Sequence, residues 1–161
     1  HRRLRFSPVL LAGLSLLILL HLAGGLVELP RKVTTEGSHL LYNWWIWKPH
    51  LKFDQLVHAY GSMLATWFCW QLMQRTVASR TGWAFQDLRP TGELLLFCIL
   101  SGLGIGAMNE VMEFATTHFV REHNVGGYVN NSMDLVANTV GSLIAAAAIW
   151  LHSRRKAPHN S

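Results

Sequence analysis

Charged side chains are scarce in this chain, and their scarcity is the first guide to its class. Only 14% of the 161 residues are Asp, Glu, Lys or Arg, whereas 50% are hydrophobic. The hydrophobic residues are gathered into long blocks, which is typical of a membrane protein and not of a soluble core. The length fits one small domain. The composition therefore predicts a single membrane domain over residues 1–161.

Cysteine is scarce as well, and nucleic-acid-binding features are lacking. Cys69 and Cys98 are the only cysteines, and both lie inside apolar blocks, so we expect two buried free thiols and no disulfide framework. The formal net charge is +5, but there is no basic stripe with interleaved aromatic residues. We therefore expect no nucleic-acid partner and no nucleotide cofactor, and we assign the positive excess to contact with anionic lipid headgroups.

Four apolar blocks are long enough to cross a bilayer as helices. They cover about residues 8–27, 53–73, 92–118 and 132–150. A cleavable signal peptide is the alternative for the first block, but its length favours a retained transmembrane helix. The connection over about residues 28–51 is rich in Trp and Tyr, whose rings favour the headgroup level. We expect it to lie along the membrane surface, where a short amphipathic helix is one possible structure. A ligand site lined by Trp is the alternative, but an aromatic belt at the interface explains the same residues.

Basic residues indicate how the spans are oriented. They gather at the start of the chain, in the loop from Arg75 to Arg89, and from Arg154 to Lys156. Four spans place all three groups on one side, which the positive-inside rule identifies as the cytoplasm. The sequence thus predicts an all-α, polytopic bundle of four transmembrane helices in a bacterial inner membrane, with both termini cytoplasmic. The connection over residues 28–51 and the connection over residues 124–131 face outward in this arrangement.

Acidic residues lie near the outer ends of three predicted helices, where charge in the membrane is costly. Asp54 and His58 are four residues apart and share a helix face. Glu110 and Glu113 share a face of the next apolar helix, and Asp134 begins the last one. At a rise of about 1.5 Å per residue, all five lie within roughly 12 Å of the outer helix ends. We therefore expect them to converge on one site, and the flanking amides are Asn109 and Asn138.

Four acids and one histidine need compensation in a low-dielectric site. The first hypothesis is a bound divalent cation, with these ligands: Asp54, His58, Glu110, Glu113 and Asp134. Carboxylates with imidazole suit Zn, Mn or Fe, and carboxylates alone suit Mg or Ca, so the metal is not distinguished. A metal-bound water would permit hydrolysis of a lipid-linked or phosphate-bearing substrate, with Glu110 or Glu113 as the candidate catalytic base.

Other hypotheses remain beside the metal site. The polar cluster would equally serve as a structural clamp in an accessory subunit of a larger membrane complex, where Gly102 and Gly106 would let another subunit approach closely. Proton transport is less favoured because the cytoplasmic halves of the helices carry no matching acids. Ser62 and Ser101 lie in apolar helices, where hydroxyls usually serve packing. We interpret His21, in the first block, as an interfacial or helix-packing histidine.

The polar residues fall into four motifs between residues 53 and 141. They are Phe53-Asp54-x-x-x-His58, Asn109-Glu110-x-x-Glu113-Phe114, Asn124-Val125-Gly126-Gly127-Tyr128-x-Asn130 and Asp134-Leu135-Val136-x-Asn138-x-x-Gly141. This series resembles the uncharacterised bacterial membrane-protein family typified by YjdF. More remotely, it is similar to VanZ-like proteins, which show a comparable order of histidine, glutamate and an Asp-x-x-x-Asn-x-x-Gly helix. The resemblance implies a polar, multi-helix membrane domain and supplies no reaction.

Overall fold

The computed structural model describes residues 6–34, 39–84, 87–119 and 127–155. Within these residues the fold is mostly helical. Its long helices are α1 (Pro8–Leu26), α2 (Phe53–Thr81), α3 (Gly92–Phe119) and α4 (Tyr128–Arg155). Between α1 and α2 lie a 3-10 turn, η1 (Leu41–Asn43), and two short strands, β1 (Trp45–Trp47) and β2 (Leu51–Lys52).

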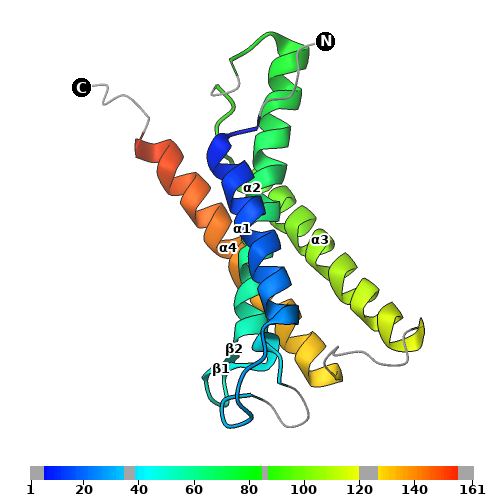
Figure 1. Ribbon diagram of the computed structural model, residues 1–161. Coiled ribbons are helices and arrows are strands. Elements are labelled where there is room, and N and C mark those ends of the chain that lie inside the picture. Colours follow the sequence, from blue (N-terminus) through cyan, green and yellow to red (C-terminus); the bar gives the residue numbers. More distant parts are fainter. Residues whose placement is uncertain (1–5, 35–38, 85–86, 120–126, 156–161) are drawn as a thin grey trace.

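Helix α2 is the centre of the bundle, and the other three helices all pack against it. Helices α3 and α4 also pack against each other, whereas α1 packs mainly on α2 and η1. Figure 1 shows that the start of α1, the end of α2 and the end of α4 lie at one end of the bundle, with the strands at the other. The chain therefore presents its strand-bearing connection and its basic helix ends at opposite ends of the molecule.

Small residues allow α2 and its neighbours to approach closely. A Cβ on Gly141 of α4 would overlap the backbone carbonyl of Ala59 in α2. A Cβ on Gly13 of α1 would lie 2.8 Å from the side chain of Leu64 in α2. These two glycines set the separation of α4 and α1 from the central helix.

The two glycines predicted as a docking face are used inside the chain. Gly102 and Gly106 are both buried. A Cβ on Gly102 would overlap the hydroxyl of Thr66, and one on Gly106 would lie 2.8 Å from the amide nitrogen of Asn138. The glycine face of α3 is therefore covered by α2 and α4. Association with other subunits stays a prediction. It required Gly102 and Gly106 to lie on a free surface, and they do not.

The connection between α1 and α2 differs from the predicted amphipathic helix. It contains η1 and an antiparallel hairpin in which Trp45 pairs with Lys52 and Trp47 with Leu51. Trp and Ile side chains favour extended backbone, and Pro49 in the hairpin turn cannot continue a helix. The all-α prediction is therefore wrong for this segment, although the rest of the described fold is helical.

Two helices are longer than the predicted spans. Helix α2 continues past residue 73 to Thr81 and ends at Gly82, whose φ of 76° is the left-handed conformation favoured by glycine. Helix α4 begins at Tyr128 and not at residue 132, and it runs on to Arg155. A run of apolar residues predicts only the part of a helix that can lie in lipid. The polar turns at the ends of α2 and α4 were therefore not predicted.

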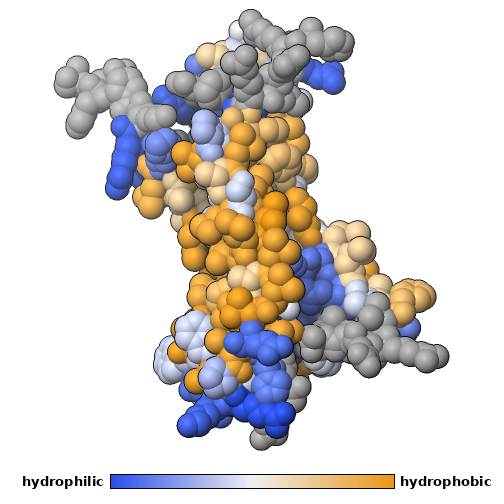
Figure 2. All heavy atoms as spheres, in the orientation of Figure 1, coloured by the Kyte–Doolittle hydropathy of each residue, from blue (hydrophilic) through white to orange (hydrophobic). Residues whose placement is uncertain are grey.

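Three helices in the described part of the chain are long and apolar enough to cross a membrane. They are α1, Gly92–Thr116 of α3, and α4. Helix α2 is not among them, because its buried face is polar and includes Gln55, His58, Ser62, Thr66 and Gln71. Figure 2 shows a hydrophobic band over the helices between two hydrophilic ends. Such a band is the surface expected of a membrane protein.

The apolar core joins α2, α3 and α4 away from the hairpin. Trp70, Cys98 and Ile149 are buried there together. Both cysteines are free, and Cys98 is fully buried as predicted. Cys69 lies at the edge of this core and stays partly exposed, so the prediction of burial is only partly right for it.

Candidate functional site

The structure brings the predicted polar residues of α2 and α3 together around His58. Nδ1 of His58 lies 3.0 Å from Oε1 of Glu110. Nε2 of His58 lies 3.5 Å from Oδ1 of Asp54 and 3.7 Å from Oε1 of Glu113. The side chains of His58 and Glu110 are almost completely buried, whereas Glu113 retains some exposure. Both ring nitrogens of one histidine therefore face carboxylates, as at a buried ion-paired centre.

Asp134 of α4 joins this group through Asn130, one turn before it in the same helix. Nδ2 of Asn130 donates to Oδ2 of Asp134 at 2.7 Å and to Oδ2 of Asp54 at 3.0 Å. Oδ1 of Asn130 accepts a hydrogen bond from Nζ of Lys52 at 2.9 Å. The amide nitrogen of Asn130 thus links carboxylates from two helices, and its oxygen binds Lys52.

Some buried carboxylate oxygens lack a hydrogen-bond partner among the described residues. They include Oε2 of Glu110 and Oδ1 of Asp134, which is fully buried. Oε1 of Glu110 has His58 at 3.0 Å, but the alignment falls short of a hydrogen bond. A buried acceptor left unsatisfied costs about 1–3 kcal/mol, and more when it is charged. These oxygens therefore call for a cation, a proton or a water molecule.

Three residues offer ligand atoms at a spacing suited to one metal ion. One ligand atom each from Asp54, His58 and Asp134 lies within 4.8 Å of the other two. Two carboxylates and an imidazole suit Zn, Mn or Fe. The other two predicted ligands lie beside this group. Glu110 faces Nδ1 of His58, the ring nitrogen opposite the one that faces Asp54. Glu113 accepts a hydrogen bond from Nδ2 of Asn109 at 2.7 Å.

A buried amide and hydroxyls continue the polar centre between the helices. Oγ of Ser62 donates to Oδ1 of Asn138 at 2.8 Å, so Ser62 acts as a packing hydroxyl, as predicted. Nδ2 of Asn138 has no hydrogen-bond partner among the described residues, and Asn138 is only 1% exposed. The free amide group of Asn138 is therefore a donor available to a ligand. Ser101, in contrast, donates to the carbonyl of Phe97 in its own helix at 2.8 Å.

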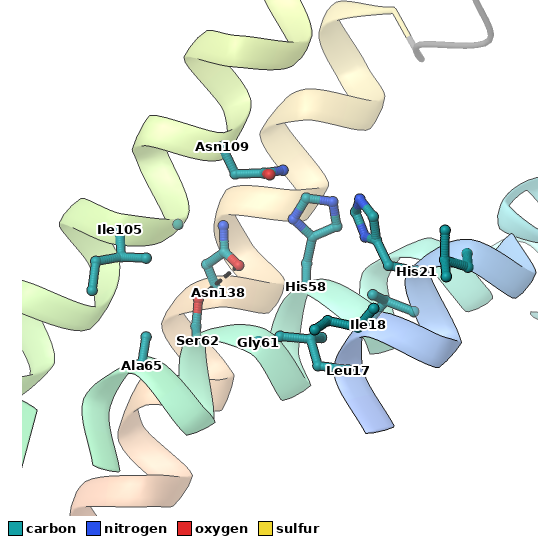
Figure 3. A pocket seen from close by; sticks show the side chains of 13 residues that line it. Leu17, Ile18, His21, His58, Gly61, Ser62, Ala65, Ile105, Asn109 and Asn138 are labelled. Carbon is teal, nitrogen blue, oxygen red and sulfur yellow. Dashed lines mark hydrogen bonds between the residues drawn. The ribbon is translucent and has the colours of Figure 1, made fainter. Parts of the chain in front are cut away.

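A pocket of about 360 Å³ opens beside His58, between α1 and α3. Figure 3 shows Leu17 and Ile18 on the α1 side and Ile105 on the α3 side. The polar side chains of the pocket are His21, His58, Ser62, Asn109 and Asn138. His58 is thus accessible from the pocket, whereas Glu110 and Asp134 are not among the lining residues. The sequence did not reveal this pocket.

Tyr42 holds the C-terminal end of α1 beside the pocket. Its hydroxyl donates to the carbonyl of His21 at 2.9 Å, and the two rings meet edge-on with centroids 5.5 Å apart. A Cβ on Gly24 would overlap the tyrosine ring. Burial, together with the charges of Asp54 and Glu113, raises the pKa of Tyr42 above its usual range, so the hydroxyl remains a donor. His21 is thus a packing histidine at the pocket wall.

Two residues of the centre were missed or misread from the sequence. The sequence prediction did not include Lys52, and it placed Asn130 in the connection over residues 124–131. Its spacing of four from Asp134 would have placed both on one helix face, but only if α4 begins before residue 130. Another part of the same motif, residues 124–126, lies outside the described residues.

Comparison with known proteins identifies the family. The family model described as "Predicted membrane protein (DUF2238)" matches residues 1–155. The chain belongs to the DUF2238 family. The predicted YjdF-like resemblance fits the DUF2238 assignment, whereas the VanZ-like resemblance stays a prediction. No curated protein and no solved structure matches the chain. The DUF2238 description supports a membrane protein and names no reaction.

Proposed function

We propose that this DUF2238 chain is a four-span bacterial inner-membrane protein whose polar centre binds a divalent cation near the outer surface. The observation that carries the proposal is the group of ligand atoms from Asp54, His58 and Asp134, within 4.8 Å of one another. They come from two helices that pack directly on each other. A cation at this point would also engage the unpartnered Oδ1 of Asp134.

The charge balance of the centre supports a cation. Three carboxylates, those of Asp54, Glu110 and Glu113, face the imidazole of His58, and a ligand atom of Asp134 lies within 4.8 Å of one on His58. Lys52 contacts this group through Asn130. When all four carboxylates are ionised, negative charge is in excess even with the imidazole protonated. Buried charges of one sign are strongly unfavourable unless they are neutralised. A divalent ion supplies the missing positive charge.

The packing of α2 supports a transmembrane role for this helix. At about 1.5 Å per residue, its 29 residues exceed the roughly 30 Å thickness of a hydrocarbon core. Its polar face is buried against the other helices, which shields it from lipid. With α2 counted, the chain has four spans, and the basic helix ends share the cytoplasmic side.

Glu110 and Glu113 are both candidate bases, because Glu113 lies on the Nε2 side of His58 together with Asp54, and Glu110 lies on the Nδ1 side. Oε2 of Glu110 is buried and has no hydrogen-bond partner among the described residues, whereas Glu113 already accepts from Asn109. A carboxylate beside a metal-bound water can accept its proton during hydrolysis. The reaction class that fits is metal-assisted hydrolysis of a lipid-linked or phosphate-bearing substrate.

Metal analysis of the purified protein tests the cation proposal. We expect a bound divalent ion in the unmodified chain and its loss in Asp134→Asn and His58→Ala. Asp87→Asn, which changes an exposed acid in the α2–α3 connection, is the matched control and should retain the ion. Equal metal content in all four proteins would overturn the proposal.

The second candidate function is a non-catalytic subunit in which the same residues form a helix clamp. The observation that favours it is the amide of Asn130, which bridges Asp54 and Asp134 while it accepts from Lys52. This network holds α2 and α4 together without an ion. A stable, metal-free chain that purifies with other membrane proteins would support the clamp.

A further inference from the structure

The pocket beside His58 owes its existence to small residues on α2. Helix α1 approaches α2 closely at Gly13, where a Cβ would contact Leu64, and it is fixed again near Gly24 by Tyr42. Between these two points α2 presents Gly61 and Ala65 to the pocket. Gly61 has no side chain and that of Ala65 is short. A space therefore remains between α1 and α2 in the region between the contacts at Gly13 and Gly24.

The mouth of the pocket lies between two helices that are suited to lipid. Helices α1 and α3 are both apolar enough to cross a membrane. Ile18 and Ile105 line the pocket and are 60% and 50% exposed. In Figure 2 a hydrophilic patch interrupts the hydrophobic surface between α1 and α3. With α1 and α3 placed in the membrane as proposed, the opening between them faces the bilayer.

The inner end of the pocket is polar and offers an unused donor. Asn138 is almost fully buried, and its Nδ2 has no hydrogen-bond partner among the described residues. Figure 3 shows this amide turned toward Asn109 and His58. A buried donor of this kind requires an oxygen acceptor. A ligand with a hydrocarbon chain and an oxygen-bearing head would meet both parts of the pocket.

The charges behind the pocket determine the kind of headgroup. His58 is backed by Asp54, Glu110 and Glu113, and these three carboxylates with Asp134 exceed the charge of the proposed divalent cation, so the inner end carries no net positive charge that would attract an anion. An anionic headgroup would be repelled by these acids. An uncharged hydroxyl or ester oxygen can accept from Asn138 without that repulsion.

We infer that this pocket binds the hydrocarbon chain of a single-chain amphiphile, such as a long-chain alcohol or a monoacylglycerol, with its uncharged oxygen headgroup at Asn138 and His58. The volume of about 360 Å³ falls in the range of roughly 300–1,000 Å³ that is usual for small-molecule sites. The inference rests on the proposed membrane placement of α1 and α3. Of the ligands named, the monoacylglycerol carries an ester bond that the candidate hydrolysis could cleave, so the inference favours an uncharged lipid ester over a phosphate-bearing substrate.

A photoactivatable hexadecanol tests this inference on the full chain in phosphatidylcholine nanodiscs. We expect saturable labelling of peptides that contain Leu17, Ile18 or Ile105, and competition by unlabelled hexadecanol. Ala65→Phe fills the pocket and should lower the labelling about tenfold. Ala148→Phe, the same change at an exposed site outside the pocket, should leave it unaltered. Ile105→Trp narrows the mouth from an exposed position and serves if Ala65→Phe does not fold.

Three outcomes would overturn the inference. Labelling that persists in both pocket variants would show that the probe lies on the outer surface. Equal or stronger labelling by a matched photoactivatable palmitic acid would contradict the uncharged headgroup. Labelling that hexadecanol does not displace would show that phosphatidylcholine or non-specific contact accounts for it. Metal content measured on the same samples separates this result from the cation proposal, since Ala65→Phe leaves every proposed ligand in place.

Discussion

Nδ1 of His58 lies 3.0 Å from Oε1 of Glu110, and this pair joins α2 to α3 inside the bundle. Glu110 is 3% exposed, so the contact is shielded from solvent. The pair stands at the meeting point of the proposed cation group and the proposed lipid pocket, because the opposite ring nitrogen faces Asp54 and the ring lines the pocket. Changes at either residue therefore report on the whole centre.

Removal of Glu110 should destabilise the fold strongly. Glu110→Ala leaves His58 without its nearest carboxylate in a buried site, and breaking a buried pair typically costs roughly 3–5 kcal/mol. Unfolding in detergent, followed by circular dichroism, measures the loss. Glu93→Ala, at an exposed acid of the same helix, should leave the unfolding midpoint unchanged. A midpoint for Glu110→Ala that equals the control would show that the pair does not hold the helices.

The contact between Gly141 and Ala59 predicts a sharp difference between two glycines. Gly141→Ala places a methyl group on a backbone carbonyl, so α2 and α4 must separate, at a cost of about 1–3 kcal/mol or more. Gly104→Ala adds a methyl group where nothing lies within 4 Å, and it should leave stability equal or slightly raised. Thermal unfolding of the two variants compares them directly, and equal midpoints would contradict the packing of α4 on α2.

Asn130 distinguishes a cation site from a clamp. Asn130→Ala removes the amide donor shared by Asp54 and Asp134, which should cost about 1–3 kcal/mol when a chelator is present. A divalent cation should restore much of the loss, because it binds the two carboxylates that have lost their shared N–H donor. Thermal midpoints with and without added metal measure this. A loss that metal does not reduce would favour the clamp.

The proposed four-span arrangement predicts which sites are reachable from each side of the membrane. In a chain with Cys69 and Cys98 replaced by alanine, single cysteines at the exposed positions Trp47, Trp83 and His152 act as reporters. An impermeant maleimide should reach the Trp47 site from outside, and the other two only from the cytoplasmic side. Labelling of the Trp47 and Trp83 sites from the same side would show that α2 does not cross.

The sequence predicted the helices best where apolar residues alone decide them. Helix α1 occupies Pro8–Leu26, close to the predicted block, because Pro8 and the cap Ser7 mark its start. The hairpin at Trp45–Trp47 was missed because aromatic rings suit both an interfacial helix and a strand. The extra turns of α2 and α4 were missed because polar helical turns carry no apolar signal.

The site was predictable where one helix supplies the spacing, and not where packing supplies it. Asp54 and His58 are four residues apart in one helix and share a face wherever that helix begins. Their proximity therefore follows from the sequence. The bridge from Asn130 to Asp54 depends on where α4 begins and how it crosses α2. The pocket depends on Gly61 and Ala65 facing α1, which no pattern within a single helix reveals.

An anomalous-difference map from crystals grown with a divalent transition metal tests the cation site most directly. We expect a peak bounded by Asp54, His58 and Asp134, with each residue at metal–ligand distance. A map with no peak at this point, while His58 keeps its contact with Glu110 and Asn130 still bridges the two aspartates, would contradict the cation site.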